Sequence, residues 1–125
     1  MTKTSAFFNL LVIRSENIDR AVKFYEAIGL TFDKHSHGKG PEHYACEKNG
    51  LVFEIYPLSS KQPTTIGIRL GFAVNDVDIL IETLPQIGAA IISSPKDSEW
   101  GRRAVVKDLD GHTVELVEGT KKEIL

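Results

Sequence analysis

Two glutamates occupy matching positions in two apolar stretches of this sequence. Glu54 lies in residues 49–57 and Glu115 in residues 110–117, and each stretch opens with an Asn-Gly or Asp-Gly turn. Side chains alternate between the two faces of a strand, so each glutamate points away from its apolar neighbours. A carboxylate on such a face must meet water, a cation, a metal ion or a ligand. Glu54 and Glu115 are therefore the candidate catalytic residues, as proton-transfer bases or as metal ligands.

A third polar side chain interrupts an apolar strand in the middle of the chain. In residues 68–74, apolar residues alternate with a face that carries Arg69. We expect this guanidinium to lie outside the apolar core, as the two glutamates do.

The glutamate stretches are the ends of a longer repeat. Residues 17–29 and 76–88 each have helical apolar periodicity, a capping residue at the start and Ile-Gly at the end. Strands are predicted at 7–13, 30–32, 43–47 and 51–57, and again at 68–74, 89–92, 103–107 and 112–117, with a loop at 93–102. The sequence thus predicts an α+β fold of two tandem βαβββ modules, residues 7–58 and 66–118, within a single domain spanning 1–125.

Composition excludes several classes of partner. A net charge of −2 with scattered Lys and Arg gives no reason to expect nucleic acid, and no apolar run is long enough to span a membrane. The single Cys46 cannot form an internal disulfide, and we interpret it as an inert thiol. A cytoplasmic location is expected.

Several motifs resemble those of the vicinal oxygen chelate superfamily, which includes glyoxalase I, bleomycin-resistance proteins and extradiol dioxygenases. They are a helix ending in Phe-Tyr-x-x-x-Gly-Leu, a Val-x-Asp helix start and a closing Asp-x-Asp-Gly-x-x-x-Glu-Leu. The residues concerned are Phe24, Tyr25, Gly29 and Leu30; Val74 and Asp76; and Asp108, Asp110, Gly111, Glu115 and Leu116. The resemblance implies a curled mixed sheet with a concave cleft, often completed by a second chain.

In metalloenzymes of this family, the first and last strands of each module hold a divalent metal. Carried over by position, the last-strand ligands are Glu54 and Glu115. The first-strand positions fall on Arg69 and on Asn9 or Leu10; we prefer Asn9, which leaves a polar side chain on the face equivalent to Arg69. Arginine stays protonated and cannot bind a cation, so the sequence departs from the family pattern.

The departure suggests an electrostatic replacement. Two carboxylates in one cleft repel unless a positive charge lies between them, and the guanidinium of Arg69 can take the place of the metal. We therefore expect no cofactor. The alternative is a divalent Zn, Ni, Mn or Fe ion held by Glu54, Glu115 and His43.

Other side chains are candidates for lining a ligand site. Tyr56 shares the face of Glu54. Tyr44 and Tyr56 could each line a ligand pocket or, equally, pack at the edge of the sheet. The candidate ligand-binding residues are Asn9, Arg69, His43, Tyr44, Tyr56, Trp100 and Arg102. Trp100 lies in the predicted loop 93–102, where two roles are open: a lid over the ligand or a contact between the two chains of a dimer. His35 and His37, in a Gly-rich segment, and His112, after a turn glycine, are interpreted as solvent-exposed.

Two classes of function follow from the resemblance. The first is a glyoxalase/bleomycin-resistance-like protein that binds a small organic ligand in its cleft without the usual metal site. The alternative is a metal-dependent lyase or isomerase of the glyoxalase I type, with a glutamate as general base. An extradiol dioxygenase fits least, because neither first-strand position is histidine. Exposed strand edges, together with the resemblance, predict a homodimer.

Overall fold

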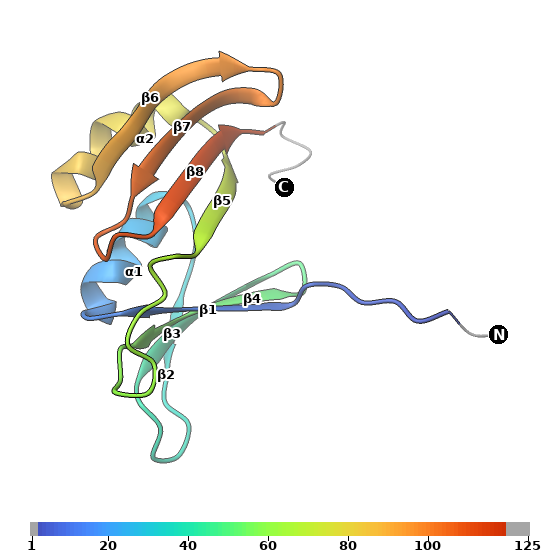
Figure 1. The fold of residues 1–125 in the computed structure, drawn as a ribbon, viewed down its shortest axis with the longest axis vertical. Coiled ribbons are helices and arrows are strands. Elements are labelled where there is room, and N and C mark those ends of the chain that lie inside the picture. Colours follow the sequence, from blue (N-terminus) through green and yellow to red (C-terminus); the bar gives the residue numbers. More distant parts are fainter. Residues whose placement is uncertain (1–2, 120–125) are drawn as a thin grey trace.

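Each half of the chain forms a βαβββ module with its own four-stranded sheet (Figure 1), in a computed structural model that describes residues 3–119. The first module contains β1 (Leu10–Ser15), α1 (Ile18–Ala27), β2 (Asp33–His35), β3 (His43–Lys48) and β4 (Leu51–Pro57). The second contains β5 (Arg69–Val74), α2 (Val77–Thr83), the 3₁₀ turn η1 (Leu84–Ile87), β6 (Ala90–Ser98), β7 (Gly101–Lys107) and β8 (Thr113–Glu118). The predicted α+β class and the two-module fold are confirmed.

The two sheets have the same topology. The first sheet has the order β1-β4-β3-β2 and the second the order β5-β8-β7-β6. In each, the first strand runs parallel to the last, and the other neighbours are antiparallel. The equivalent pairs Val12–Glu54 and Gly71–Glu115 lie at the same register step of the two modules. The duplicated sequence therefore gives a duplicated structure.

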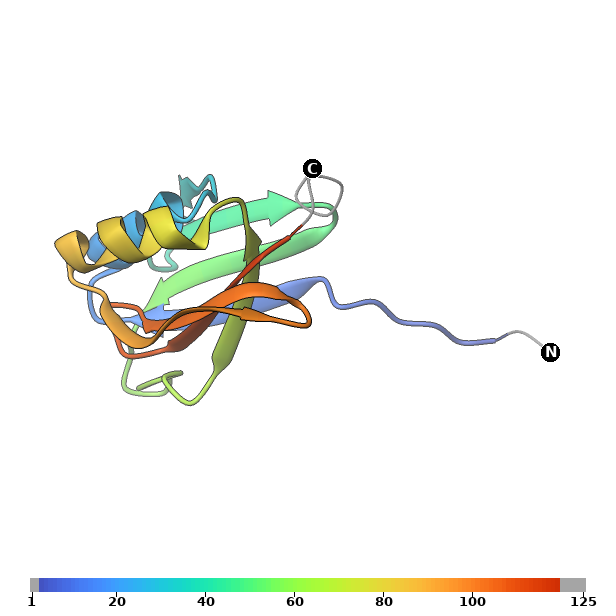
Figure 2. The same ribbon diagram turned by 90° about the horizontal axis from the view of Figure 1, so that it is seen from above.

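Each sheet has an inner face, packed on the helices, and an outer face on the other side. The inner faces share one core, in which Tyr25 of α1 contacts Phe53 of the first sheet and Phe72 of the second, with ring centroids 5.1 and 5.9 Å apart. Figure 2 shows α1 and α2 together on one side of the strands. The strand alternation places Glu54 and Glu115 on the outer faces.

Both helices begin at the expected capping residues. The side chain of Asn17 accepts a hydrogen bond from the backbone N–H of Arg20, and Asp76 does the same for Ile79. The second helix is shorter than the predicted 76–88 segment, because Pro85 lacks an N–H donor and the chain continues as the 3₁₀ turn η1.

Three strand predictions are displaced. β1 begins at Leu10 rather than residue 7, and β2 covers Asp33–His35 rather than 30–32. Residues 93–98, predicted as loop, continue β6, which pairs with β7 through two register shifts. An edge strand tolerates this polar segment with Pro95, because one side of it needs no partner.

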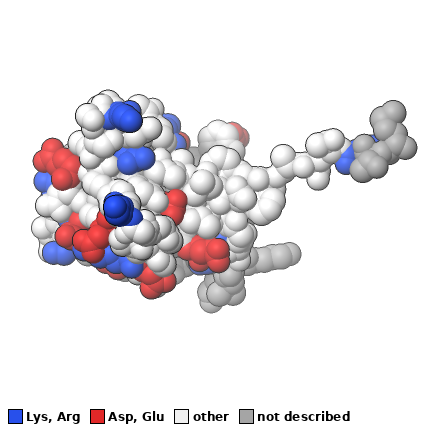
Figure 3. All heavy atoms as spheres, turned by 90° about the horizontal axis from the view of Figure 1, so that it is seen from below, with Lys and Arg blue, Asp and Glu red and all other residues white. Residues whose placement is uncertain are grey.

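An N-terminal arm, defined as residues 3–9, leaves the body of the molecule in an extended path (Figure 1). Phe7 and Phe8 in this arm are 71% and 67% exposed. Figure 3 shows acidic and basic atoms interleaved on the body and the arm largely without charge. Within residues 3–119, no helix is long and apolar enough to cross a membrane.

Candidate functional site

Two arginines hold the carboxylate of Glu115 on the outer face of the second sheet. Gly71 of β5 and Val105 of β7 lie opposite Glu115, so Arg69 and Arg103 are its diagonal neighbours on the same face. Nε of Arg69 donates to Oε2 of Glu115 at 2.8 Å, and Nε of Arg103 donates to Oε1 at 2.7 Å. Nη2 of Arg103 also donates to Oε1.

This arrangement keeps Glu115 ionised. Hydrogen bonds from Arg69 and then from Arg103 hold the pKa of the Glu115 carboxyl below its usual range. Arg69 lies on the outer face, as strand alternation predicts, but of the two glutamates it contacts Glu115 alone and does not lie between them. Arg103 is a residue that the sequence did not indicate. Alternation along residues 103–107 puts Arg103 on the face opposite Ala104, but only the pairing with β8 shows that it reaches Glu115.

Glu54 has a different set of neighbours on the outer face of the first sheet. Nε2 of His43 lies 3.5 Å from Oε2 of Glu54, and the His43 side chain is 1% exposed. The ring of Tyr56 stacks on the His43 ring with centroids 4.1 Å apart. The guanidinium carbon of Arg14 lies 5.0 Å from the centroid of Tyr56. This face therefore combines a carboxylate and an imidazole with an aromatic surface.

Two further histidines extend this row toward the edge of the sheet. The rings of His35 and His37 lie 5.8 and 5.3 Å from the ring of His43, and both residues are exposed. His35 is the direct cross-strand neighbour of His43. These exposed positions agree with the interpretation of the Gly-rich segment.

The two glutamates belong to separate groups of contacts within one chain. The ring centroids of Phe53 and Phe72, on the inner faces of the two sheets, lie 6.1 Å apart. The carboxylates of Glu54 and Glu115 lie on the outer faces instead. Across residues 3–119, no hydrogen bond or ion pair joins Glu54 to Glu115 or to Arg69. Glu54 thus meets His43, and Glu115 meets Arg69 and Arg103, each on its own sheet.

The register corrects the choice between Asn9 and Leu10. In the second sheet, Gly71 lies opposite Glu115, and Arg69 is two residues before Gly71. In the first sheet, Val12 lies opposite Glu54, and Leu10 is two residues before Val12. Asn9 lies just before β1 and accepts a hydrogen bond from Val52 through its backbone oxygen. Leu10 is therefore the equivalent of Arg69, and Asn9 falls on the other face.

Three more candidate ligand-binding residues lie away from the glutamates. The Tyr44 hydroxyl donates to Asp19 of α1 at 2.6 Å, so this side chain lies on the helix side. Arg102 donates twice to Asp78 of α2, at 2.8 and 3.0 Å. Trp100 lies in the β6–β7 turn and is 74% exposed.

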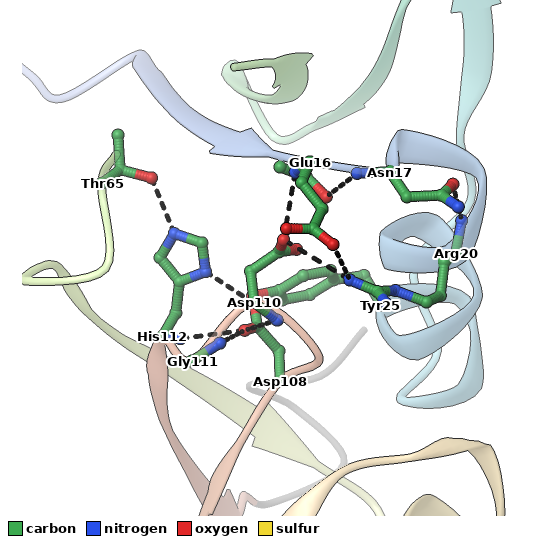
Figure 4. A network of polar contacts seen from close by, with 10 residues as sticks. Glu16, Asn17, Arg20, Tyr25, Thr65, Asp108, Asp110, Gly111 and His112 are labelled. Atoms are coloured by element: carbon green, nitrogen blue, oxygen red, sulfur yellow. Dashed lines mark hydrogen bonds and ion pairs between the residues drawn. The ribbon is translucent and has the colours of Figure 1, made fainter. Parts of the chain in front are cut away.

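A buried polar network joins the two modules through the turn before β8 (Figure 4). The Tyr25 hydroxyl donates to Oδ2 of Asp108 at 2.6 Å, and Nδ1 of His112 lies 2.8 Å from the same oxygen. Nε2 of His112 lies 2.6 Å from Oγ1 of Thr65 in the linker. Oδ1 of Asp108 accepts the backbone N–H groups of Asp110, Gly111 and His112. The network therefore links α1, the linker and the turn.

His112 is fully buried, so the interpretation that it faces solvent is wrong. Alternation places His112 on the same face as Val114, which was the signal for burial. A carboxylate only accepts hydrogen bonds, so Nδ1 of His112 carries the proton that meets Asp108. Burial raises the pKa of the Tyr25 hydroxyl, and Asp108 raises it further. Both tyrosine and histidine thus serve as donors to one buried carboxylate.

The residues at the family's metal positions do not fit a divalent ion. Leu10, Glu54, Arg69 and Glu115 supply two carboxylates on different sheets and no imidazole. Among the described residues, two other groups have carboxylate or imidazole atoms close enough for an ion. In the first, Asp108 and His112 contact each other and Oδ1 of Asp110 accepts the backbone N–H of Glu16. In the second, Asp76 caps α2 and Glu118 accepts the N–H of Val77.

Comparisons with known proteins agree with this fold. The family model described as Glyoxalase/Bleomycin resistance protein/Dioxygenase superfamily matches residues 8–116. An uncharacterized protein of Mycolicibacterium smegmatis is 32% identical over 103 residues, covering 82% of this chain and 85% of the relative.

Solved structures are similar at lower identity. TnmS3, an antibiotic binding protein from Streptomyces sp. CB03234, has a TM-score of 0.72 at 21% identity, covering 95% of this chain and all of that one (100%). A hypothetical protein from S. aureus has a TM-score of 0.72 at 18% identity, covering 94% of this chain and 96% of that one. The extent of the family match and of the Mycolicibacterium relative shows that the chain belongs to the glyoxalase/bleomycin resistance protein/dioxygenase superfamily.

Proposed function

We propose that this protein binds a small organic ligand on the outer face around Glu115, with no metal ion at that position. The observation that carries the proposal is the pair of guanidinium groups, Arg69 and Arg103, on the Glu115 carboxylate. Arginine cannot lose its proton to make room for a cation, so the carboxylate is already neutralised by fixed positive charge. The similarity to TnmS3, an antibiotic binding protein, supports a small organic molecule as the ligand.

The arginines also give the site a means of recognition. A guanidinium has five N–H donors, and Glu115 takes one from Arg69 and two from Arg103. Other N–H groups of both side chains are able to donate to carbonyl, phenol or carboxylate oxygens of a ligand. The neighbouring face is small and apolar at Gly71, Ala73 and Val117, which suits contact with a flat ring.

We also propose that the protein is a homodimer in which outer faces of two copies contribute to one site. Within one chain the His43–Glu54 pair and the Arg69–Glu115 pair lie on separate sheets, and the exposed Phe7 and Phe8 give apolar area that a second copy could cover. Light scattering after gel filtration measures the mass directly. A monomeric mass at all concentrations would contradict the dimer.

Metal analysis tests the proposed site first. Elemental analysis of tag-free protein, followed by titration with Ni²⁺, Zn²⁺, Mn²⁺ and Fe²⁺, should show no ion that depends on Glu115. About one ion per chain, lost in Glu115→Ala, would overturn the proposal and favour the metal-dependent lyase or isomerase, with glutamate as base.

A ligand screen tests the binding itself. Aromatic antibiotics that raise the melting temperature of the wild type should lose most of this effect in Arg103→Gln. Arg102→Gln is the matched control, since Arg102 is adjacent in sequence but binds Asp78 on the helix side. Equal loss in both variants would contradict binding on the outer face.

A further inference from the structure

Three imidazole rings and one carboxylate share the outer face of the first sheet. His35 of β2 lies directly opposite His43 of β3. Ala45, two residues further along β3, lies opposite Glu54 of β4. Opposite residues, and alternate residues of one strand, share a face, so both histidines lie on the face of Glu54. His37 follows in the segment between β2 and β3 (Figure 1), with its ring 5.3 Å from the ring of His43. We call His35, His37, His43 and Glu54 the histidine group.

The ring of His43 is held with one nitrogen toward Glu54. Nδ1 of His43 lies 3.3 Å from the backbone oxygen of Pro41, which only accepts, so Nδ1 carries the proton and Nε2 presents a lone pair. Nε2 lies 3.3 Å from the Tyr56 hydroxyl and 3.5 Å from Oε2 of Glu54. A histidine that binds a metal through one nitrogen usually donates the other N–H to a carbonyl or carboxylate in this way. The His43 ring is therefore oriented as a metal-binding imidazole is.

The distance between Nε2 of His43 and Oε2 of Glu54 is that between two ligands of one ion. Bonds of about 2.1 Å from Zn²⁺ to nitrogen and oxygen, at the tetrahedral angle, place the two ligand atoms about 3.4 Å apart. The structure has 3.5 Å. In this tautomer both atoms are acceptors, and no proton of His43 lies between them. A cation between the two atoms would satisfy both.

The rings of His35 and His37 lie at the distances that a shared ion requires. With Zn–N bonds of about 2.1 Å and ring centres about 1.2 Å behind each nitrogen, imidazoles at the tetrahedral angle have centroids about 5.4 Å apart. The centroids of His35 and His37 lie 5.8 and 5.3 Å from that of His43, and 5.9 Å from each other. The planes of His35 and His37 are within 9° of parallel, so both rings must turn before one nitrogen of each faces a common centre. Both residues are exposed, and exposed side chains change rotamer readily.

From this geometry we propose that the histidine group binds one divalent ion of the chemistry of Zn²⁺, through its three imidazoles and its carboxylate. Imidazole suits Zn²⁺, Ni²⁺ and Cu²⁺, and three imidazoles with one carboxylate complete a tetrahedral zinc site. The group shares Glu54 with the family's metal positions, but its other ligands differ, because Glu115 lies on the other sheet. The site is also separate from the proposed ligand site around Glu115.

An ion at this place would join three parts of the first module. Residues 36–42 connect β2 to β3, and within them the N–H of Gly40 donates to the backbone oxygen of His37 at 2.9 Å. This hydrogen bond closes a turn at residues 37–40. Binding of His37 to an ion held by β3 and β4 would tie the turn to the sheet. The ion would therefore fix this segment over the outer face.

Zinc titration of tag-free protein, treated first with a chelator, tests the site. Calorimetry at neutral pH should show saturation at about one ion per chain. His35→Gln and His37→Gln replace exposed side chains, so both variants should fold as the wild type does. Each should bind Zn²⁺ at least about tenfold more weakly. No saturable binding by the folded wild type, or unchanged affinity in both variants, would overturn the proposal.

Glu54→Gln and Glu115→Gln are a matched pair, because the two glutamates occupy equivalent positions of the two modules. Glu54→Gln should weaken zinc binding at least about tenfold, and Glu115→Gln should leave it unchanged. Equal weakening in both variants would place the ion between the modules and overturn the site. An ion lost only in Glu115→Gln would overturn this site and the proposed function together, whereas absence of any ion would overturn this site alone.

Two further measurements locate the ion. Two-dimensional proton–nitrogen spectra of the imidazoles should show Zn²⁺ on Nε2 of His43, with Nδ1 still protonated. Zinc should also slow tryptic cleavage after Lys39, which lies in the turn, at least about threefold in the wild type and not in the variant that carries both His35→Gln and His37→Gln. Zinc on Nδ1 of His43, or equal slowing of cleavage in wild type and variant, would contradict the proposed ligands.

Discussion

Arg102 and Arg103 are adjacent in β7, yet their guanidinium groups bind carboxylates on opposite faces of the second sheet. Arg102 donates to Asp78 of α2 at 2.8 and 3.0 Å, and Arg103 donates to Glu115 of β8 at 2.7 Å. Strand alternation alone produces this division. One arginine thus attaches the helix to the sheet, while its neighbour belongs to the candidate ligand site.

The first prediction concerns the ionisation of Glu115. Arg69→Gln and Arg103→Gln should each raise the pKa of the Glu115 carboxyl toward its ordinary value of about 4.3, because each removes a cationic hydrogen-bond donor. Carboxyl-detected NMR titration measures this pKa directly. Arg102→Gln should leave the Glu115 pKa in place and raise that of Asp78 instead. An unchanged Glu115 pKa in the Arg69 and Arg103 variants would contradict the arrangement.

The second prediction concerns the buried hydroxyl of Tyr25. Tyr25→Phe removes a donor to the buried Asp108 carboxylate and should lower the free energy of unfolding by about 1.5–3 kcal/mol, as for hydrogen bonds to charged groups. Urea denaturation at neutral pH measures the change. Tyr44→Phe is the control, because its hydroxyl donates to the exposed Asp19, and it should have a clearly smaller effect. Equal losses would show that the network does not stabilise the module junction.

The third prediction concerns acid stability. Burial would raise the pKa of Asp108, but hydrogen bonds from His112 and Tyr25 outweigh it and hold that pKa below its usual value. A depressed native pKa stabilises the fold above the unfolded pKa of about 3.9, and this contribution is lost as the pH falls through the native pKa. Asp108→Asn should therefore be less stable than wild type at pH 7, with the difference shrinking in acid below about pH 4.

Urea denaturation midpoints of the wild type and of Asp108→Asn, measured from neutral pH into acid, test whether the difference in stability shrinks. Asp78→Asn provides the comparison, since the pKa of Asp78 is also lowered, by Arg102, but at an exposed site. Its effect should be small and should fade with added salt. A constant difference between wild type and Asp108→Asn at every pH would contradict the assigned role.

The sequence was sufficient for the fold because the duplicated pattern repeats at every level. Caps, periodicity and turn glycines agree in both copies, so each module is specified locally and the order of elements follows. The secondary-structure prediction was wrong where local composition and tertiary strand pairing favour different structures. Residues 93–98 are polar and contain Pro95, yet pairing along one edge of β7 holds them in a strand. Pairing of this kind is not visible in local composition.

The candidate site was only partly accessible from the sequence, for the same reason. Alternation fixed the face of Glu115 and Arg69, but the contact with Arg103 depends on the register between β7 and β8. A one-residue uncertainty at the start of β1 exchanged Leu10 for Asn9, because a shift of one reverses the face of every side chain. Register is therefore the information that the structure added.

The last prediction concerns two glycines with similar backbone angles and different surroundings. Gly29 and Gly101 have φ of +117° and +125°, so alanine is strained at both positions, by roughly 1–2 kcal/mol. A Cβ at Gly29 would meet no atom within 4 Å, whereas at Gly101 it would lie 2.7 Å from the backbone oxygen of Glu118.

Gly101→Ala should therefore cost about 1–3 kcal/mol more than Gly29→Ala, because the end of β7 must move away from β8. Urea denaturation of the two variants gives the difference. The displacement should also loosen Arg103, two residues along β7, so Gly101→Ala is expected to raise the pKa of Glu115 while Gly29→Ala does not. Equal stability of the two variants would show that β7 and β8 do not approach as closely as the structure describes.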